Sequence, residues 1–458
     1  MNSTLRKSSG SPVKRISLTL SSDRSTHIKP LKILVISFMF PPYNRIGAVR
    51  NGKTVKHLTE MGHDIKVISA NNQPCQKTLP LEIPDENVIY TNWLNIRKPV
   101  ELIMGGRKKV INQPNIRKGA VKSILKKTIY RAYKSLLYIP DEQIGWYPFA
   151  LNAAANVLTD WKPDLIFASG TPFTSLMAAK TLSVRYKIPW IAELRDLWAD
   201  NHYNDYYKFR KIIEKKLEAK TLSNVSGLVT VSEPLAEILA EKYNKPTTVI
   251  MNGYSPEDYP ELTGNRLNEK HLNIVYTGLI YEGKRDPTPL FKALQSLGDA
   301  AKNVRVHFYG RALSIAGRLA QQYGIDHLVK TNDPIPYKES LSIQKQADIL
   351  LLLLWDDPRE KGVYTGKLFE YIGAERPVLA IGRPDNIAAQ LIKNRKLGET
   401  IQNPNQIASR LKQWIEEKQR NNMIRPVPIE GKKGLSRKEQ SEKLEAFFLK
   451  VITGEKPK

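Results

Sequence analysis

A short polar segment after the apolar run Ile349–Trp355 carries residue types that bind a phosphorylated ligand. A continuous apolar run is typical of a buried parallel strand, and the loop at its carboxyl end leads into a helix from about Thr365. Free N–H groups at a helix start attract anions, Gly366 lets a ligand approach the backbone, and Lys367 adds a cation. Glu370 follows one turn later. This combination suits a nucleoside diphosphate, and the alternative is that Lys367 and Glu370 are solvated surface residues.

A second loop that could hold a diphosphate follows the apolar strand expected at 273–277. It contains Gly278 and the adjacent cations Lys284 and Arg285, just before a helix near 289–297. Two neighbouring cations beside a helix start suit a pyrophosphate, because guanidinium and ammonium groups form strong bonds to phosphate oxygens. The alternative is that both are ordinary exposed loop cations.

Charged residues also follow strands in the first half of the chain. The segment IPWIAELRDLW places Glu193, Arg195 and Asp196 at the carboxyl end of an apolar strand. Burying three charges is costly unless they are paired or serve a ligand, so the alternatives are a site and a structural Arg–Asp pair. An earlier loop, FPPYNRIGAVR, offers Gly47 for close backbone approach and Arg50 in the first helical turn. Its alternative is a tight turn with a solvated arginine.

Strands and helices alternate along both halves of the chain, which predicts two α/β domains with parallel sheets. In the first half, the sequence predicts strands at 31–38, 65–69, 164–169, 190–194 and 227–231, and helices at 47–61 and 174–186. In the second half, it predicts strands at 273–277, 304–309 and 349–355, and helices at 289–297 and 338–346. Doubly wound sheets bind ligands at the carboxyl ends of their strands, where the loops above lie.

The 458 residues are too many for one ordinary hydrophobic core. We therefore expect the following division of the chain: a disordered basic tail at 1–30, an N-terminal Rossmann-like domain at 31–253, a linker at 254–270, a C-terminal Rossmann-like domain at 271–400, and C-terminal helices at 401–458.

Several functional classes lack their sequence signatures in this chain. No G-x-G-x-x-G follows either first strand and no G-x-x-x-x-G-K-[ST] occurs, which disfavours a dinucleotide site and a P-loop kinase. A G-x-S-x-G nucleophile elbow is missing too. The seven histidines lack metal-ligand spacing, so we expect no metal and no organic cofactor. The single cysteine, Cys75, excludes a disulfide framework and fits a reducing compartment.

The ordered set of strand-end motifs resembles glycosyltransferase family 4, the retaining GT-B enzymes, over roughly residues 32–400. The motifs are FPPYNRIGAVR, PDLIFASGTPFTS, IPWIAELRDLW, VSEP, NGY, YTGLIYEGKRDPTPL, HFYG, IPYKESL and GVYTGKLFEYIGAERPVLA. The similarity is strongest to bacterial sugar transferases of polysaccharide assembly. It implies a GT-B fold, with two Rossmann-like domains facing a central cleft. It also implies metal-free transfer from a nucleotide-sugar donor with retained anomeric configuration.

The resemblance implies residue roles by position. The implied catalytic residues are Asp196, Arg195, Lys284 and Lys367. The implied donor-binding residues are Gly278, Lys284, Arg285, Tyr337, Thr365, Gly366, Lys367 and Glu370, and the implied acceptor-binding residues are Gly47 and Arg50. In this assignment the cations hold the donor diphosphate, Glu370 accepts the ribose hydroxyls, and Tyr337 flanks the nucleobase. Asp196 would contact the transferred sugar or the acceptor.

The chain departs from the family pattern at three places. Gly362 stands where the first of two glutamates eight positions apart is usual, and that glutamate commonly contacts the transferred sugar. Gly278 is followed by leucine rather than arginine, which leaves Lys284 and Arg285 to carry the phosphate-binding charge. Arg195-Asp196 stands where many members have His-Asp.

The net charge of +26 is concentrated in two segments. Residues 1–30 contain six lysines and arginines against one acidic residue, and residues 97–134 contain twelve against one. Apolar residues within 117–138 recur at helical spacing, so the basic segment 97–138 could lie as an amphipathic helix on an anionic membrane. The alternative is that its apolar stripe packs on the N-terminal domain. The chain contains no recognised nucleic-acid module, so we expect no nucleic-acid partner.

These observations favour a glycosyltransferase of hexosyltransferase type that acts in bacterial cell-surface polysaccharide biosynthesis. Its acceptor would be a glycan or a polyprenyl-diphosphate-linked sugar, and it would work in the cytoplasm, peripherally on the inner face of the membrane. Two alternatives remain on the same fold: a sugar-nucleotide epimerase or phosphorylase, and a non-catalytic protein that recruits partners to a membrane.

Overall fold

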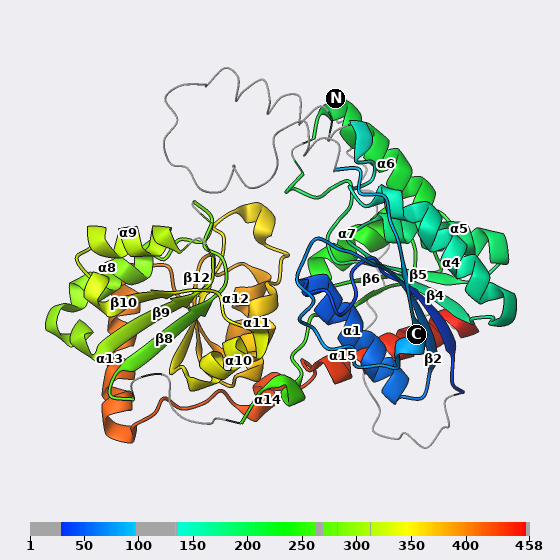
Figure 1. The fold of residues 1–458 in the computed structure, drawn as a ribbon. Helices are drawn as coiled ribbons and strands as arrows, with labels where there is room; N and C mark the ends of the chain where they lie inside the picture. The colour runs from blue at the N-terminus through cyan, green and yellow to red at the C-terminus, as the bar shows by residue number, and fades with distance from the viewer. Residues whose placement is uncertain are drawn as a thin grey trace, which may run out of the picture.

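The computed structural model describes residues 29–97, 133, 136–204, 206–261, 267, 269–281, 283–311 and 313–454. The predicted basic tail 1–30 and basic segment 97–138 lie almost wholly outside these residues, and the linker 254–270 lies partly outside them. Within the described residues, two parallel sheets with helices on both faces form two domains that lie side by side (Figure 1). The predicted α/β fold with two doubly wound domains is therefore confirmed.

The N-terminal sheet has the strand order β3-β2-β1-β4-β5-β6-β7 among the described residues. Its strands are β1 (Lys32–Ile36), β2 (Asp64–Ala70), β3 (Val88–Thr91), β4 (Leu165–Gly170), β5 (Trp190–Leu194), β6 (Gly227–Thr230) and β7 (Thr247–Val249). Its helices are α1 (Ile46–Glu60), α4 (Tyr147–Asp160), α5 (Thr174–Tyr186), α6 (Lys208–Leu222) and α7 (Glu233–Tyr243). The order reverses between β1 and β4, and the loops after these two strands diverge to open a crevice.

The C-terminal sheet repeats this topology in the order β10-β9-β8-β11-β12-β13. Its strands are β8 (Leu272–Thr277), β9 (Val304–Tyr309), β10 (Val329–Asn332), β11 (Ile349–Leu353), β12 (Val378–Ile381) and β13 (Gly398–Thr400). Its helices are α8 (Thr288–Leu297), α9 (Ser314–Gln322), α10 (Tyr337–Gln346), α11 (Gly366–Gly373), α12 (Ile387–Asn394), α13 (Pro404–Asn421) and α14 (Ile429–Lys432). Here the order reverses between β8 and β11. The loops after these strands are the two that carry the predicted phosphate-binding cations.

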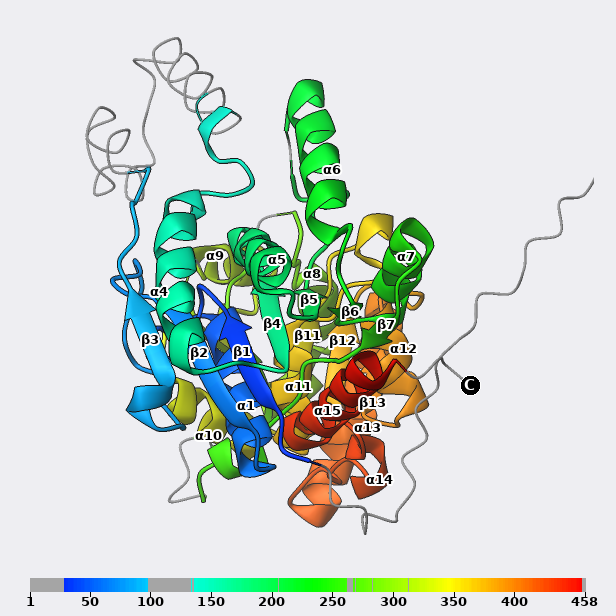
Figure 2. The same ribbon diagram turned by 90° about the vertical axis from the view of Figure 1, so that its right-hand side faces the viewer.

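The last helix, α15 (Arg437–Thr453), leaves the C-terminal domain and packs on the N-terminal one. Figure 2 shows it beneath the N-terminal sheet, beside α1. Its Phe447 and Phe448 are buried in the same apolar cluster as β1, and the Phe448 ring centroid lies 5.2 Å from that of Phe167 in β4. A capping box starts the helix, in which Ser436 Oγ accepts a bond from the Glu439 backbone N–H. The N-terminal core is thus completed by the end of the chain.

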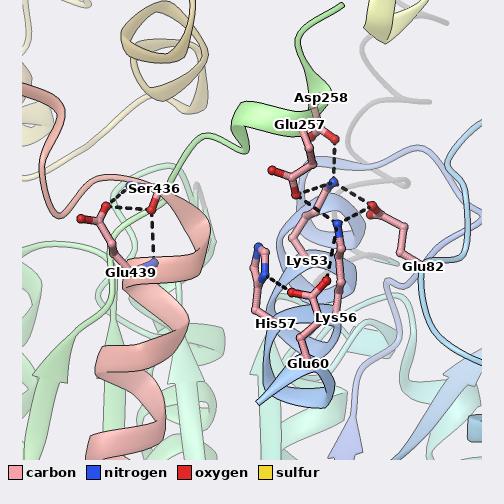
Figure 3. Close-up of polar contacts among 9 residues, drawn as sticks. All are labelled: Lys53, Lys56, His57, Glu60, Glu82, Glu257, Asp258, Ser436 and Glu439. Atoms are coloured by element: carbon pink, nitrogen blue, oxygen red, sulfur yellow. Dashed lines mark hydrogen bonds and ion pairs between the residues drawn. The ribbon is translucent and has the colours of Figure 1, made fainter. Parts of the chain in front are cut away.

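A cluster of ion pairs fixes the start of the chain segment that joins the domains (Figure 3). Lys53 Nζ, from α1, lies 2.6 Å from Asp258 Oδ1 and 2.9 Å from Glu82 Oε1. Lys56 Nζ, one turn along α1, lies 3.0 Å from Glu257 Oε1 and 3.2 Å from Glu82 Oε1. Asp258 and Glu257 lie in η4 (Pro256–Asp258), in the connection after β7, so these contacts hold the connection against the N-terminal domain.

Candidate functional site

A cleft of about 500 Å³ lies between the carboxyl ends of the two sheets. We call it the inter-domain cleft, and the side chains that matter below are Ile46, Arg195, Asp196, Tyr203, Tyr281, Lys284, Arg285, Trp355, Glu360, Thr365 and Gly366. The first four come from the N-terminal domain and the rest from the C-terminal domain. The structure therefore brings together two loops of cations and one acidic loop that the sequence singled out separately.

The cations Lys284 and Arg285 are held in the cleft by aromatic rings. Lys284 Nζ lies 4.1 Å from the centre of the Trp355 ring, and the Arg285 guanidinium lies 5.1 Å from that of Tyr281. Among the described residues, neither forms an ion pair with a carboxylate. Cation–π contacts orient a charge without neutralising it, so both remain available to an anionic ligand.

Lys367 points from the start of α11 toward the first strand of the same domain. Its Nζ lies 3.2 Å from the Tyr276 hydroxyl and over that ring. Burial lowers the pKa of Lys367 to about 7, with Arg285 contributing and Glu370 opposing. Gly278 makes room for this side chain, because a Cβ there would overlap Lys367 Cε, and its φ of +126° disfavours other residues. The position of the predicted site residue Lys367 therefore depends on the predicted site residue Gly278, because any larger residue at 278 would clash with it.

Glu370 lies one turn along α11. Gln344 Nε2 donates to Glu370 Oε2 at 3.1 Å, and the Tyr259 hydroxyl donates to the Glu370 carbonyl oxygen. Burial raises the pKa of Glu370, and the Gln344 bond and Lys367 oppose the rise. Tyr337 lines a second cavity, of about 480 Å³, together with Pro336 and other residues of both domains. Glu370, predicted to bind the ribose, therefore interacts electrostatically with both Tyr337 and Lys367.

Arg195 and Asp196 form part of the N-terminal wall. Arg195 Nε donates to the Gly170 carbonyl oxygen at 3.0 Å and Nη2 to that of Thr171 at 2.5 Å. Gly47 lies against this guanidinium at the start of α1. Arg195 therefore positions the loop after β4. Burial raises the pKa of Asp196, Arg195 and a nearby histidine oppose the rise, and a further carboxylate adds to it.

The sequence predicts that Arg50 lines the acceptor side of the cleft, but in the structure this residue lies inside the N-terminal domain. Its side chain is buried, and its Nη2 and Nε donate to Glu193 Oε1 at 2.7 and 3.0 Å. The same guanidinium donates to the carbonyl oxygens of Ile250 and Met251 and to Asn252 Oδ1. The physical reason is that the Glu193 side chain is buried in β5, so its negative charge requires a buried cationic partner. The structural ion pair that involves the segment IPWIAELRDLW is therefore Arg50–Glu193, and not the Arg–Asp pair considered as an alternative.

Glu360 in the inter-domain cleft and its partner His202 carried no sequence signal. His202 lies in the loop after β5 and Glu360 in η7 (Pro358–Glu360), and their side chains meet across the two domains. Neither belongs to a recognisable motif, and 158 positions separate them in the chain. Only the position of Glu360, two residues before the unexpected Gly362, could have drawn attention to it.

A separate cavity of about 320 Å³ lies within the N-terminal domain, beside the inter-domain cleft. This N-terminal pocket has aromatic walls and acidic residues, among them Phe38, Trp93, Asp141, Glu142, Phe173 and Trp198. The Phe173 and Trp198 rings stack with centroids 4.7 Å apart. Asp141 Oδ1 accepts a bond from Thr174 Oγ1 at 2.6 Å, and burial raises the pKa of Asp141. Asn201 contributes to this pocket, while Asp196 and Tyr203 of the same loop contribute to the cleft.

Two further features bear on ligands and location. In the ranges that the structure covers, no group of three or more His, Cys, Asp or Glu side chains could hold a metal ion. Of the helices described there, none combines the length and the apolar character needed to cross a bilayer.

Comparisons with known proteins agree with this architecture. Residues 52–258 match the family model of Glycosyltransferase Family 4. The fold is similar to sucrose-phosphate synthase from Thermosynechococcus elongatus (TM-score 0.57, 12% identity, 93% of this chain and 100% of that one). It is also similar to HepE from Anabaena in complex with UDP (TM-score 0.56, 11% identity, 93% and 100%). A third similar structure is a putative UDP-N-acetylglucosamine 2-epimerase from Listeria monocytogenes (TM-score 0.53, 13% identity, 94% and 99%). No functionally curated protein matches the sequence significantly.

Proposed function

We propose that this chain, which belongs to Glycosyltransferase Family 4 over residues 52–258, transfers a sugar from a nucleotide-sugar donor to an acceptor held by the N-terminal domain. The family match confirms the resemblance seen in the sequence. The observation that carries the proposal is the pair of cations Lys284 and Arg285 in the inter-domain cleft, which form no ion pair with a carboxylate in the part of the chain that the structure describes. The Anabaena structure, of similar fold, contains UDP, which supports a nucleotide-sugar donor here.

In this proposal the C-terminal domain binds the donor. Lys284, Arg285 and Lys367 hold the diphosphate, with the free N–H groups of α11 beside them. Glu370 accepts the ribose hydroxyls and Tyr337 flanks the base. As the sugar–phosphate bond breaks, negative charge grows on the leaving diphosphate, and fixed cations in a desolvated cleft stabilise it.

We assign the acceptor to the N-terminal pocket. An aromatic face such as that of Trp93 can stack on the C–H face of a sugar ring, and carboxylates such as Asp141 can accept its hydroxyl groups. The loop that carries Asp196 borders both the pocket and the cleft, so an acceptor there would lie next to the donor sugar, which supplies the proximity that transfer requires. Asp196 is our candidate for contact with the reacting sugar, and retention of configuration is part of the proposal.

The acceptor class and the location extend the proposal further. We infer a glycan or polyprenyl-diphosphate-linked acceptor of cell-surface polysaccharide assembly, used at the inner face of the membrane. The basic composition of residues 97–138 supports this inference, since each cation near an anionic surface adds about 1 kcal/mol of attraction.

Nucleotide binding provides the direct test. We expect UDP or another nucleoside diphosphate to raise the melting temperature of the protein, because a ligand at about 100 times its Kd adds about 2.7 kcal/mol of stability. Incubation with the matching nucleotide sugar should then yield a transferred or hydrolysed product with retained configuration. No shift with any nucleoside diphosphate or nucleotide sugar would contradict the proposal, and release of an epimerised donor without acceptor would favour an epimerase.

Donor affinity is expected to depend on pH through Lys367. Its pKa in the free protein is about 7, and a bound diphosphate must raise that pKa, so donor binding takes up a proton above pH 7. Affinity for UDP-glucose, whose diphosphate stays ionised in this range, should therefore be constant below pH 7 and fall by up to about tenfold per pH unit above it. Calorimetry from pH 6 to 9 at constant ionic strength measures this. A flat profile in wild type, or the same slope in Lys367→Ala, would contradict it.

A further inference from the structure

Acidic and imidazole groups from both domains meet in the inter-domain cleft, in the wall that also contains Asp196. His202 Nε2, from the N-terminal domain, lies 2.6 Å from Glu360 Oε1, from the C-terminal domain. Burial and a hydrogen bond to Glu360 also raise the pKa of the Tyr203 hydroxyl. Glu360, Asp196 and Tyr203 line the same cavity as Lys284 and Arg285. The cleft thus has a cationic part suited to phosphate and an acidic part suited to hydroxyl groups.

The backbone of Glu360 is anchored from several sides. Its N–H donates to the Asp357 carbonyl oxygen at 2.9 Å, and its own carbonyl oxygen accepts from Asn386 Nδ2 at 2.8 Å and from the Val363 N–H at 3.0 Å. The residue is only 8% exposed. A carboxylate on so fixed a backbone is preorganised, which is what precise recognition of a ligand requires.

The neighbouring position 362 holds a glycine, so the carboxylate in this segment must come from another residue. A Cβ at Gly362 would lie 3.1 Å from Pro234 Cβ, at the start of α7, and the Gly362 carbonyl oxygen accepts a bond from Ser232 Oγ at 2.8 Å. A side chain at position 362 would therefore contact α7 of the other domain closely at its Cβ. In this segment the carboxylate that faces the cavity is Glu360.

We propose that Glu360 binds hydroxyl groups of the transferred sugar, and that His202 and Tyr203 are positioning residues that hold Glu360 from the opposite domain. The inference rests on the proposed function. A carboxylate accepts two or more hydroxyl hydrogen bonds, and charge-assisted bonds of this kind are stronger than neutral ones. Because its holders belong to the N-terminal domain, the sugar site is complete only while the two domains are in contact.

Calorimetry with paired probes tests the role of Glu360. The probes are UDP, UDP-glucose, UDP-galactose and UDP-N-acetylglucosamine, and the variants are Glu360→Gln and, as a matched control, Glu416→Gln on the exposed face of α13. We expect wild type and the control to bind one sugar nucleotide more tightly than UDP. Glu360→Gln should bind UDP within about threefold of wild type and lose about tenfold or more in affinity for that sugar nucleotide.

The outcomes separate this inference from the function on which it rests. If wild type binds UDP but prefers no sugar nucleotide, or if Glu360→Gln keeps the preference or weakens UDP binding equally, the role of Glu360 is overturned while the proposed function stands. If wild type binds none of the probes and no other nucleoside diphosphate or nucleotide sugar, both are overturned. For the positioning role, His202→Ala should raise KM for the donor, and His202→Gln, which keeps an N–H donor, should restore it. Equal defects in the two variants would overturn that role.

Discussion

Replacing Lys367 with alanine is expected to lower kcat/KM for sugar transfer by about 100- to 1000-fold, the usual effect of removing one preorganised donor to a developing charge. The Lys367 side chain leaves the start of α11, and its ammonium group lies against Tyr276 of β8, next to the other cations of the inter-domain cleft. Its loss removes a charge that stabilises the leaving diphosphate most strongly as the bond breaks. Initial rates with the nucleotide sugar identified by binding give the measurement.

A second lysine provides the control for this prediction. Lys393 lies exposed on α12 in the same domain, so Lys393→Ala removes one positive charge without touching the cleft. We expect its rate to stay within about twofold of wild type, as surface substitutions usually do little. A Lys367→Ala enzyme as active as Lys393→Ala would contradict the assignment of Lys367 to the diphosphate.

Replacing Arg50 with alanine is expected to destabilise the protein by about 3–5 kcal/mol, because it leaves a buried carboxylate without its partner. Arg50 and Glu193 have side chains only 5% and 3% exposed. Burial alone would raise the pKa of Glu193, but Arg50 brings it below its ordinary value, so the ion pair persists at neutral pH. Because this pKa is lowered, the pair stabilises the fold above pH 4.5 and its contribution fades as the solution is acidified below that value. Urea unfolding at pH 7 and pH 4 measures the loss.

Two variants make the Arg50 prediction specific. Arg420→Ala removes an exposed arginine from the end of α13 and should change the unfolding free energy by less than about 0.5 kcal/mol. Arg50→Met combined with Glu193→Leu removes both charges and should recover part of the stability, because an apolar pair needs no counter-charge. If Arg50→Ala unfolds like wild type and only its acceptor kinetics change, Arg50 serves the acceptor as the sequence first suggested.

The strands and helices that carry the site were predictable from local patterns. The strand predicted at 190–194 is β5, and the helix predicted at 47–61 is α1 with its ends shifted by one residue. Continuous apolar runs mark strands that are buried on both faces, so the loops after them could be located as well. The cation loops after β8 and β11 converge because parallel strands place their carboxyl ends at one edge of a sheet.

Partnerships between distant residues could not be predicted in the same way. Arg50 looked like a cleft residue because nothing near it in sequence shows that Glu193, 143 positions away, takes its charge. The His202–Glu360 pair depends on how two domains face one another, which no local pattern encodes. The C-terminal helices at 401–458 were predictable as helices, but the sequence does not show which domain α15 covers.

The return of α15 to the N-terminal domain has a consequence for synthesis. Translation proceeds from the N-terminus, so β1–β7 leave the ribosome long before Phe447 and Phe448, which complete their core. Until then the surface that α15 will cover is exposed, while every element of the C-terminal sheet has already been made. The domain that is synthesised first is therefore finished last, and a nascent chain halted before residue 437 leaves this apolar surface open to chaperones.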